Sequence, residues 1–207
     1  IIVGINAGFS LTFMGNTHYA IEDMGIIRCI PGMTIISPSD AGQALKAFYA
    51  SWTLNKPVYI RFTGGLNCPV IYEQEFNYQI GKGIRLREGN QIQIIATGSM
   101  VDRALKAAKI LEEKGISVDV VDMHTIKPLD MDILKKDVKL VVSVEEHSII
   151  GGLGSAIAEA LSTYSVHAPL LRLGIGDYFS QVGEYEYLLE QHGLSPEHIA
   201  NTIENNL

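Results

Sequence analysis

The chain contains little cysteine and no stretch apolar enough to cross a membrane. Its 207 residues include two cysteines, Cys29 and Cys68, which lack the CxxC spacing of many metal and redox sites. We expect two buried free thiols in a reducing cytoplasm rather than a disulfide. No apolar run approaches the roughly 20 residues of a transmembrane helix, and the N-terminal residues lack the basic region of a signal peptide. The expected location is the cytoplasm, without a membrane partner.

Basic residues are in the minority. The chain has 16 lysines and arginines against 23 aspartates and glutamates, which gives a formal net charge of −7. Such a surface repels the phosphates of nucleic acids, so no nucleic-acid partner is expected. The sequence also lacks the G-x-S-x-G elbow of α/β-hydrolases and the P-loop of many nucleotide-binding enzymes.

Apolar strand-like runs alternate with helix-like segments along the chain. Strands are expected at residues 1–5, 34–36, 58–62, 92–97, 118–121, 140–144 and 169–173. Helices are expected around residues 21–30, 41–52, 101–111, 156–161, 185–192 and 196–204. In the second of these helices, Ala41, Leu45, Phe48 and Trp52 share one face. The alternation predicts the α/β class, with two domains of mostly parallel sheet and helices on both faces.

A stretch rich in glycine separates two strand–helix series. The regular pattern weakens from Thr63 to Asn90. We therefore predict a first domain at residues 1–78, a linker at residues 79–90 and a second domain at residues 91–207. Because the chain opens directly on a strand and without an initiator methionine, we expect a longer polypeptide of which this is the C-terminal part.

The loop before the first helix contains the first candidate for chemistry. In "FMGNTHYAIED", Gly15 and Asn16 have turn chemistry, Thr17 is a candidate helix cap, and His18 is near the helix start. A histidine here can act as a general acid or base, or donate to a substrate hydroxyl. The alternative is a partly exposed histidine that binds local carbonyls, and this window alone favours it.

Three other groups have a ligand-binding and a structural interpretation. The segment "GGLGS" at residues 151–155 resembles a phosphate-binding loop but lacks G-x-G-x-x-G spacing, so close helix–sheet packing is favoured. The run Glu145–His147 ends a strand, yet neighbouring strand residues point to opposite faces, which favours a surface or interface cluster over a metal site. Arg61 suits either a carboxylate or phosphate ligand or a structural ion pair.

Several motifs in series resemble the transketolase family. The segment "GNTHYAIEDMGIIRCIPGMTIISPSD" is similar to the family's D-G-x-T-H motif, acidic helix and R-x-I-P-x-M segment. Further similarity follows in "ATGSMVDRALKAAKILEEKGISVDVVDMHTIKPLD", "EEHSIIGGLGSAIAE" and "GIGDYFSQVGEYEYLLEQHGLSPEHI". The resemblance implies the second half of a thiamine-diphosphate pyrimidine-binding domain, followed by a transketolase C-terminal domain.

The resemblance also implies an activity and its cofactors. Such enzymes use thiamine diphosphate and Mg²⁺ to transfer a two-carbon ketol unit from a ketose to an aldose, and the cofactor supplies the chemistry. The residues that bind the diphosphate and metal, and the glutamate that activates the cofactor, are expected upstream, so this chain is not active alone. A homodimer is implied, with or without a separate N-terminal subunit.

Within the motif, Thr17-His18 matches the family, and His18 is expected to contact the sugar substrate. Three departures affect the substrate-binding candidates. Met14 replaces the aspartate of D-G-x-T-H, Asn6 replaces a phosphate-binding histidine, and Gly64 stands where a phosphate-binding arginine is typical. Arg61 is three residues before Gly64. Since charge-assisted hydrogen bonds contribute about 1.5–3 kcal/mol each, we expect a sugar or sugar-phosphate bound in a non-standard pose.

Three rival interpretations remain. A 1-deoxy-D-xylulose-5-phosphate synthase would use pyruvate, and its family resemblance is nearly as good. The β subunit of an oxo-acid dehydrogenase shares the architecture, but the "GNTH" loop and the C-terminal tail fit transketolases better. A non-catalytic C-terminal module for assembly or regulation is the alternative from another class.

Overall fold

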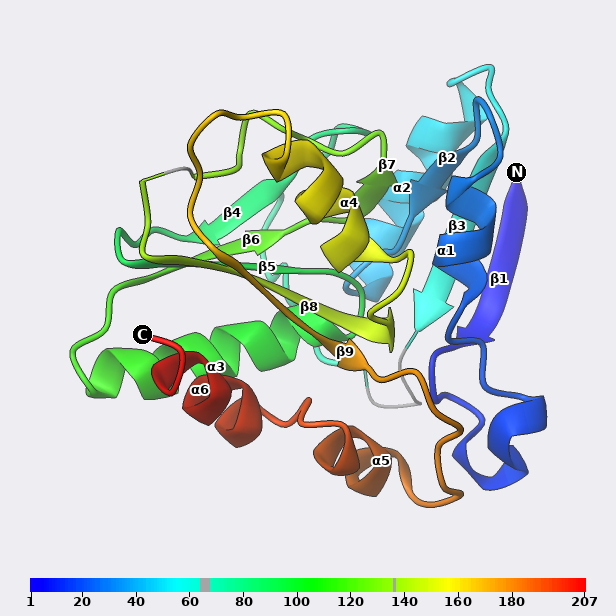
Figure 1. Cartoon of the computed structure of the whole chain (residues 1–207). Coiled ribbons are helices and arrows are strands. Elements are labelled where there is room, and N and C mark those ends of the chain that lie inside the picture. The colour runs from blue at the N-terminus through cyan, green and yellow to red at the C-terminus, as the bar shows by residue number, and fades with distance from the viewer. Residues whose placement is uncertain (64–67, 136) are drawn as a thin grey trace.

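Two mostly parallel β-sheets, of four and five strands, organise the protein (Figure 1). The computed structural model describes residues 1–63, 68–135 and 137–207. The strands are β1 (Ile2–Ala7), β2 (Thr34–Ile36), β3 (Val58–Thr63), β4 (Ile84–Arg87), β5 (Ile92–Ala96), β6 (Val118–Asp122), β7 (Thr125–Lys127), β8 (Leu140–Ser148) and β9 (Leu170–Ile175). The helices are the 3₁₀ segment η1 (Thr12–Thr17), α1 (Asp23–Arg28), α2 (Ala41–Trp52), α3 (Met100–Glu113), α4 (Leu153–Leu161), α5 (Tyr185–Gln191) and α6 (Pro196–Glu204). The predicted α/β class is confirmed.

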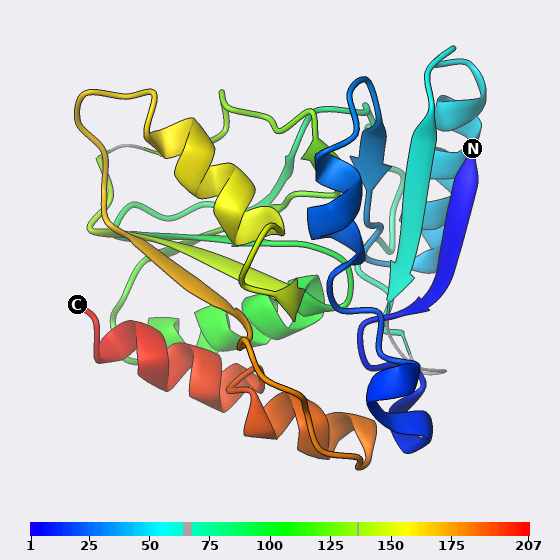
Figure 2. The ribbon, with the colours of Figure 1, turned by 45° about the vertical axis from the view of Figure 1, so that its right-hand side comes forward.

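The five-stranded sheet has the order β4-β6-β5-β8-β9, in which only β4 runs antiparallel to its neighbour. Helices α3 and α6 cover one face and α4 covers the other (Figure 2). Every residue of β5 and β8 is buried. Such strands must be covered on both sides, which explains the mostly apolar runs at Ile92–Ala96 and at residues 140–144.

The four-stranded sheet has the order β1-β3-β2-β7. Helix α2 begins after Asp40, whose carboxylate accepts a 2.7 Å hydrogen bond from the Gln43 amide and so caps the helix. Strand β7 follows β6 in the chain but pairs antiparallel with β2. The second half of the chain therefore contributes one strand to the first sheet.

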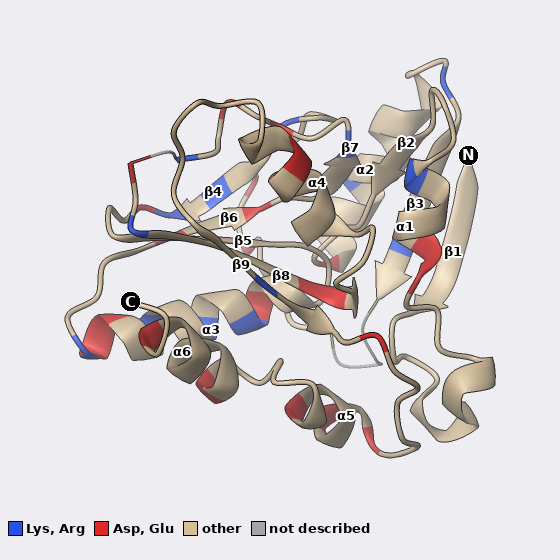
Figure 3. Cartoon of the chain, in the orientation of Figure 1, with Lys and Arg blue, Asp and Glu red and all other residues tan. Residues whose placement is uncertain are grey.

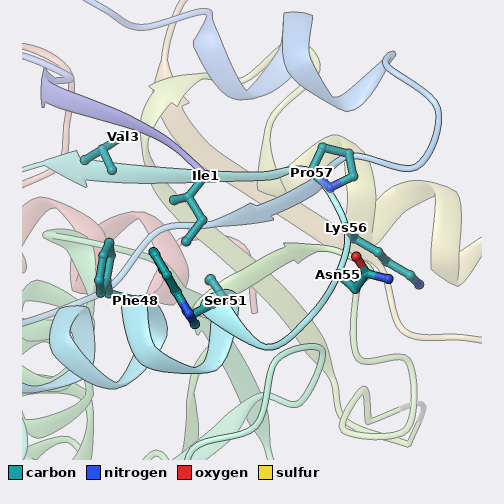
Figure 4. A pocket seen from close by; sticks show the side chains of 8 residues that line it. Ile1, Val3, Phe48, Ser51, Asn55, Lys56 and Pro57 are labelled. Carbon is teal, nitrogen blue, oxygen red and sulfur yellow. The ribbon is translucent and has the colours of Figure 1, made fainter.

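In the part of the chain that the structure describes, the edge strand β1 and one face of α2 expose apolar side chains. On the edge strand β1, Ile2 is 56% exposed and Ile5 is 68% exposed. The face of α2 that carries Leu45, Phe48 and Trp52 is also exposed, although an apolar helix stripe ordinarily packs against a core. Between β1 and the end of α2 lies a hollow of about 670 Å³ (Figure 4).

Several local predictions differ from the structure. Strand β4 lies in the range expected to be a linker, and β7 was not predicted. Cys29 and Cys68 are free but exposed, so the expectation of buried thiols was wrong. Thr17 does not cap α1, which begins at Asp23 after Glu22. Within the described residues, no helix is both long and apolar enough to span a membrane.

Candidate functional site

His18 is exposed on a loop that is closed at its base. The loop starts after β1, and Gly8 and Ala20 form an isolated antiparallel bridge, with N···O distances of 2.8 and 3.3 Å. The intervening residues include η1, where Gly15 takes a positive φ of 72° that favours glycine. The His18 amide donates to the Gly15 carbonyl at 2.9 Å, and Thr17 Oγ1 lies 2.9 Å from His18 Nδ1. Because His18 is exposed and its Nδ1 is beside Thr17, Nε2 is the candidate group for a ligand.

Aromatic side chains fill the space under this loop. Phe9 is fully buried and makes an edge-to-face contact with Tyr19, with ring centroids 4.9 Å apart. On its other side Phe9 stacks on His192 at 5.2 Å. The Tyr19 hydroxyl lies 2.7 Å from the Thr12 carbonyl oxygen and 3.1 Å from that of Gln181. The loop is thus packed on the C-terminal segment, not suspended in solvent.

A pocket of about 490 Å³ opens beside this loop. Asn16, Tyr19 and Glu22 line it from the loop side, and Asp177 and Tyr178 line it from the C-terminal segment. This pocket is large enough for a small ligand. None of the loop residues lines the larger hollow between β1 and α2.

The other predicted substrate-binding residues are only partly gathered around His18. Asn6 is exposed at the end of β1, where a left-handed φ of 57° coincides with a shift in the β1–β3 register. Met14 and Thr17 are exposed on the same loop as His18. Gly64 lies outside the described residues. Met14, Thr17 and His18 therefore share one loop, and Asn6 precedes that loop at the end of β1.

Arg61 is a correction to the predicted set. Its side chain is 1% exposed, and Nε lies 3.0 and 2.8 Å from the two carboxylate oxygens of Asp23. Burial raises the pKa of Asp23, but the charge and hydrogen bond of Arg61 outweigh it and hold that pKa below its usual value. The structure therefore supports the ion-pair interpretation, and Arg61 is not available to a substrate.

At residues 151–155 the structure supports the favoured interpretation of close packing over a phosphate-binding loop. Glu145, fully buried at the end of β8, accepts hydrogen bonds from the amides of Leu153 (2.6 Å) and Gly154 (2.8 Å) at the start of α4. A Cβ atom on Gly152 would approach Glu145 Oε2 to 1.9 Å. Burial raises the pKa of Glu145 to about 7 although both amides oppose this. An internal carboxylate thus occupies the place of an anionic ligand.

Glu146 points to the opposite face of β8, as the strand pleat predicts. Its carboxylate accepts from the Phe9 amide and the Tyr185 hydroxyl, both at 2.6 Å, and from the Ser99 hydroxyl. Burial raises the pKa of Glu146, and these three donors act in the other direction.

His147 joins β8 to α1. Its Nε2 accepts from the Gly25 amide at 3.2 Å, and Nδ1 lies 2.7 Å from the Ser148 carbonyl oxygen. Because burial and the nearby Arg61 disfavour the charged form, the pKa of His147 is lowered to about 4. The run Glu145–His147 is thus a cluster at the interface of the two sheets; Figure 3 shows acidic residues at the carboxyl end of β8, on the side of α1 and β3.

The residues of this chain do not fit a metal-bound diphosphate. Among residues 1–63, 68–135 and 137–207, no group of three or more His, Cys, Asp or Glu side chains could hold a metal ion. The amides after Gly151-Gly152 already bind Glu145.

Two family models match the chain. The transketolase pyrimidine binding domain matches residues 1–68, and the transketolase C-terminal domain matches residues 81–199. The chain belongs to the transketolase family. A protein of Methanocaldococcus jannaschii assigned as a transketolase C-terminal section is 42% identical over 98% of this chain and 64% of its own length.

Other transketolase relatives show the same relation to this chain. The 6-deoxy-6-sulfo-D-fructose transketolase subunit SqwH of a Clostridium species is 41% identical over 96% of this chain and 62% of its own. A 1-deoxy-D-xylulose-5-phosphate synthase of Caldanaerobacter subterraneus is 38% identical over 91% of this chain and 31% of its own. A solved structure, a split-gene transketolase described as an inactive β4 tetramer, superposes with a TM-score of 0.85 at 35% identity and covers 100% of this chain and 65% of that one. The chain thus spans less than two thirds of the length of these transketolases.

Proposed function

We propose that this chain supplies the substrate-facing loop and the C-terminal domain of a thiamine-diphosphate-dependent transketolase that transfers a two-carbon ketol unit from a ketose to an aldose. The observation that carries the proposal is the exposed His18 on a loop closed by the Gly8–Ala20 bridge, in a chain of this family. Thiamine diphosphate and Mg²⁺ are held by polypeptide outside this chain.

In this proposal His18 acts as a hydrogen-bond donor. When the Thr17 hydroxyl donates to Nδ1, the proton of the neutral imidazole is on Nε2, which is then the atom that donates to a substrate oxygen. A positioned donor stabilises negative charge that develops on oxygen as a C–C bond is broken or formed. Asn6 and the 490 Å³ pocket beside Asn16 and Tyr19 provide further polar groups for sugar hydroxyls.

We further propose that the sugar is not bound by the standard phosphate site. Asn6, at the end of β1, and Met14, on the loop of His18, are exposed and carry no positive charge, and Arg61 is committed to Asp23. One relative is named for 6-deoxy-6-sulfo-D-fructose, a sugar with a sulfo group at its terminal carbon. That name supports an unphosphorylated or differently substituted substrate.

The test is steady-state ketol transfer by the complete enzyme with thiamine diphosphate and Mg²⁺. Matched aldose acceptors with a terminal hydroxyl, phosphate or sulfonate should be compared by kcat/KM. A preference for the unphosphorylated or sulfonated acceptor is expected. A strong preference for the phosphate would contradict the changed-site proposal and leave an ordinary transketolase.

Two other candidate functions are each supported by one similar protein. The similarity to a 1-deoxy-D-xylulose-5-phosphate synthase is tested in the same assay by using pyruvate as the donor. The similarity to a structure described as an inactive β4 tetramer supports a chain without activity of its own. Activity that appears only when the chain is assembled with its complementary polypeptide separates a catalytic half from a regulatory module.

A further inference from the structure

We propose that Glu146 is a positioning residue: from the second sheet, it holds the loop of residues 8–20 that presents His18. Through this contact the C-terminal domain sets the orientation of the substrate-facing His18. The catalytic consequence rests on the proposed function, whereas the mechanical role does not.

The first support is the contact at the loop base. Glu146 is 1% exposed, and Oε1 accepts the Phe9 amide at 2.6 Å. Phe9 directly follows Gly8, which forms the closing bridge with Ala20. A Cβ atom on Gly8 would approach Glu146 Oε1 to 2.1 Å, so this close approach requires the glycine.

The second support is that the other end of the loop is tied to the same residue. Arg61 Nη2 donates to the Ala20 carbonyl at 3.1 Å and to the Glu146 carbonyl at 3.0 Å. The side chain of Glu146 therefore holds the start of the loop, and its backbone is joined through Arg61 to the end. His18 lies two positions before Ala20, within this closed ring of contacts.

The third support is chemical. The donors to Glu146 are one amide and the hydroxyls of Ser99 and Tyr185. A carboxylate has two acceptor oxygens, so one can accept the Phe9 amide and the other the two hydroxyls. In a glutamine an NH₂ group replaces one of these oxygens and would face hydrogen-bond donors. Both hydroxyls come from the C-terminal half, at the start of α3 and α5, so they fix the carboxylate to that half.

The neighbouring carboxylate offers a matched control. Glu145 is also fully buried on β8, but its carboxylate accepts from the amides of Leu153 and Gly154 at the start of α4 rather than from residues 8–20. Glu145→Gln therefore removes a buried charge from the same strand without touching the loop. If Glu146 only stabilised the fold, Glu145→Gln and Glu146→Gln would change the hydrogen exchange of residues 9–20 to the same extent.

The experiment is amide hydrogen exchange of the complete enzyme, with wild type, Glu146→Gln, Glu146→Asp and Glu145→Gln, followed by acceptor kinetics. We expect Glu146→Gln to speed exchange of residues 9–20 by about 10- to 100-fold, the range that corresponds to a lost buried hydrogen-bond partner. Glu145→Gln should speed exchange around residues 152–156 and leave the loop unchanged. Glu146→Asp, which keeps the charge, should restore part of the protection.

In kinetics, Glu146→Gln should lower kcat/KM by about 10²-fold, the effect of a small misplacement of a reacting group, with a raised KM for the acceptor. Loss of folded enzyme alone lowers the maximal rate and leaves KM unchanged. Equal loop protection in Glu146→Gln and Glu145→Gln would overturn the inference. If the wild type shows no ketol transfer, the proposed function fails, and hydrogen exchange still decides the role of Glu146.

Discussion

Strand β8 of the five-stranded sheet and strand β1 of the four-stranded sheet differ in how far their residues are buried. All nine residues of β8 are buried, and the carboxyl end of this strand is occupied by Glu145, Glu146, His147 and the segments packed against them. On β1, four of six residues are exposed. In open α/β sheets, ligands ordinarily bind beyond the carboxyl ends of the strands. In the second sheet that edge contacts Phe9 and Gly25 of the first half of the chain. Under the proposed function, the second sheet supports the first half, which carries His18.

The largest effect is expected where the two halves are joined. Arg61→Met should destabilise the protein by about 3–5 kcal/mol, because it leaves the partly buried Asp23 without its partner. Lys106→Met is the control, since it breaks an ion pair with Asp102 in which Lys106 is 60% exposed and should cost less than about 1 kcal/mol. Urea unfolding measures both; similar losses would contradict a structural role of Arg61 at the junction.

The contrast between the sheets can be measured with one residue type. Ile94 on β5 is fully buried and Ile5 on β1 is 68% exposed. Ile94→Ala should lower the free energy of unfolding by about 2–5 kcal/mol, whereas Ile5→Ala should change it by no more than about 0.5 kcal/mol. A large loss in Ile5→Ala in the isolated chain would show that β1 is covered.

The filled edge should also respond to pH through His147. Its folded pKa is about 4 against an ordinary 6.5, so its contribution to stability is present above pH 6.5 and is lost as the pH falls towards 4. The groups that face it are Arg61, Asp23 and Glu145. Protonation would place an N–H at Nε2 against the Gly25 amide.

The measurement is the difference in unfolding free energy between wild type and His147→Gln. This difference should shrink by about 3 kcal/mol between pH 7 and pH 4. Glu145 acts in the opposite direction, because its raised pKa of about 7 gives stability that is lost as the pH rises. A difference that stays constant over this range would contradict the buried neutral histidine.

A smaller effect distinguishes a close contact from backbone strain. Gly8 and Gly32 both have positive φ, of 69° and 74°, but only a Cβ on Gly8 meets another side chain. Gly32→Ala should cost about 1–2 kcal/mol from strain alone. Gly8→Ala should lower the free energy of unfolding by more than Gly32→Ala does, and it should also lower kcat/KM of the complete enzyme. Equal melting temperatures of the two variants would contradict the close approach of Gly8 to Glu146.

The sequence predicted most of the core elements because their signals are local. Strands β5, β6 and β8 are β-branched runs between turn residues, and the apolar stripe of α3 ends at Gly115, where φ is 79°. Strands β4 and β7 are short, and β4 is only partly buried, so neither has a periodic pattern. For α2, the pattern identified an apolar face but carries no information on whether that face is covered.

The prediction of His18 as a site residue rests on local turn chemistry and a family motif that coincide. The structure shows that His18 is exposed on the loop, and its contact with a substrate stays a prediction. The strand pleat also predicted that Glu145 and Glu146 have different partners. The contact of Arg61 with Glu146 spans 85 positions and that of Phe9 with Glu146 spans 137. Such pairs have no signature in a single sequence, so Arg61 was assigned to the substrate and Glu146 to no role in presenting His18.

The most direct test of the account is His18→Ala in the complete enzyme, with ketol transfer and thiamine diphosphate affinity measured on the same preparation. We predict that kcat/KM falls by about 10²- to 10³-fold, the cost of losing one donor to a developing negative charge, while cofactor affinity is unchanged. Unchanged turnover, or a loss of cofactor binding that accounts for the loss of turnover, would contradict the role assigned to His18.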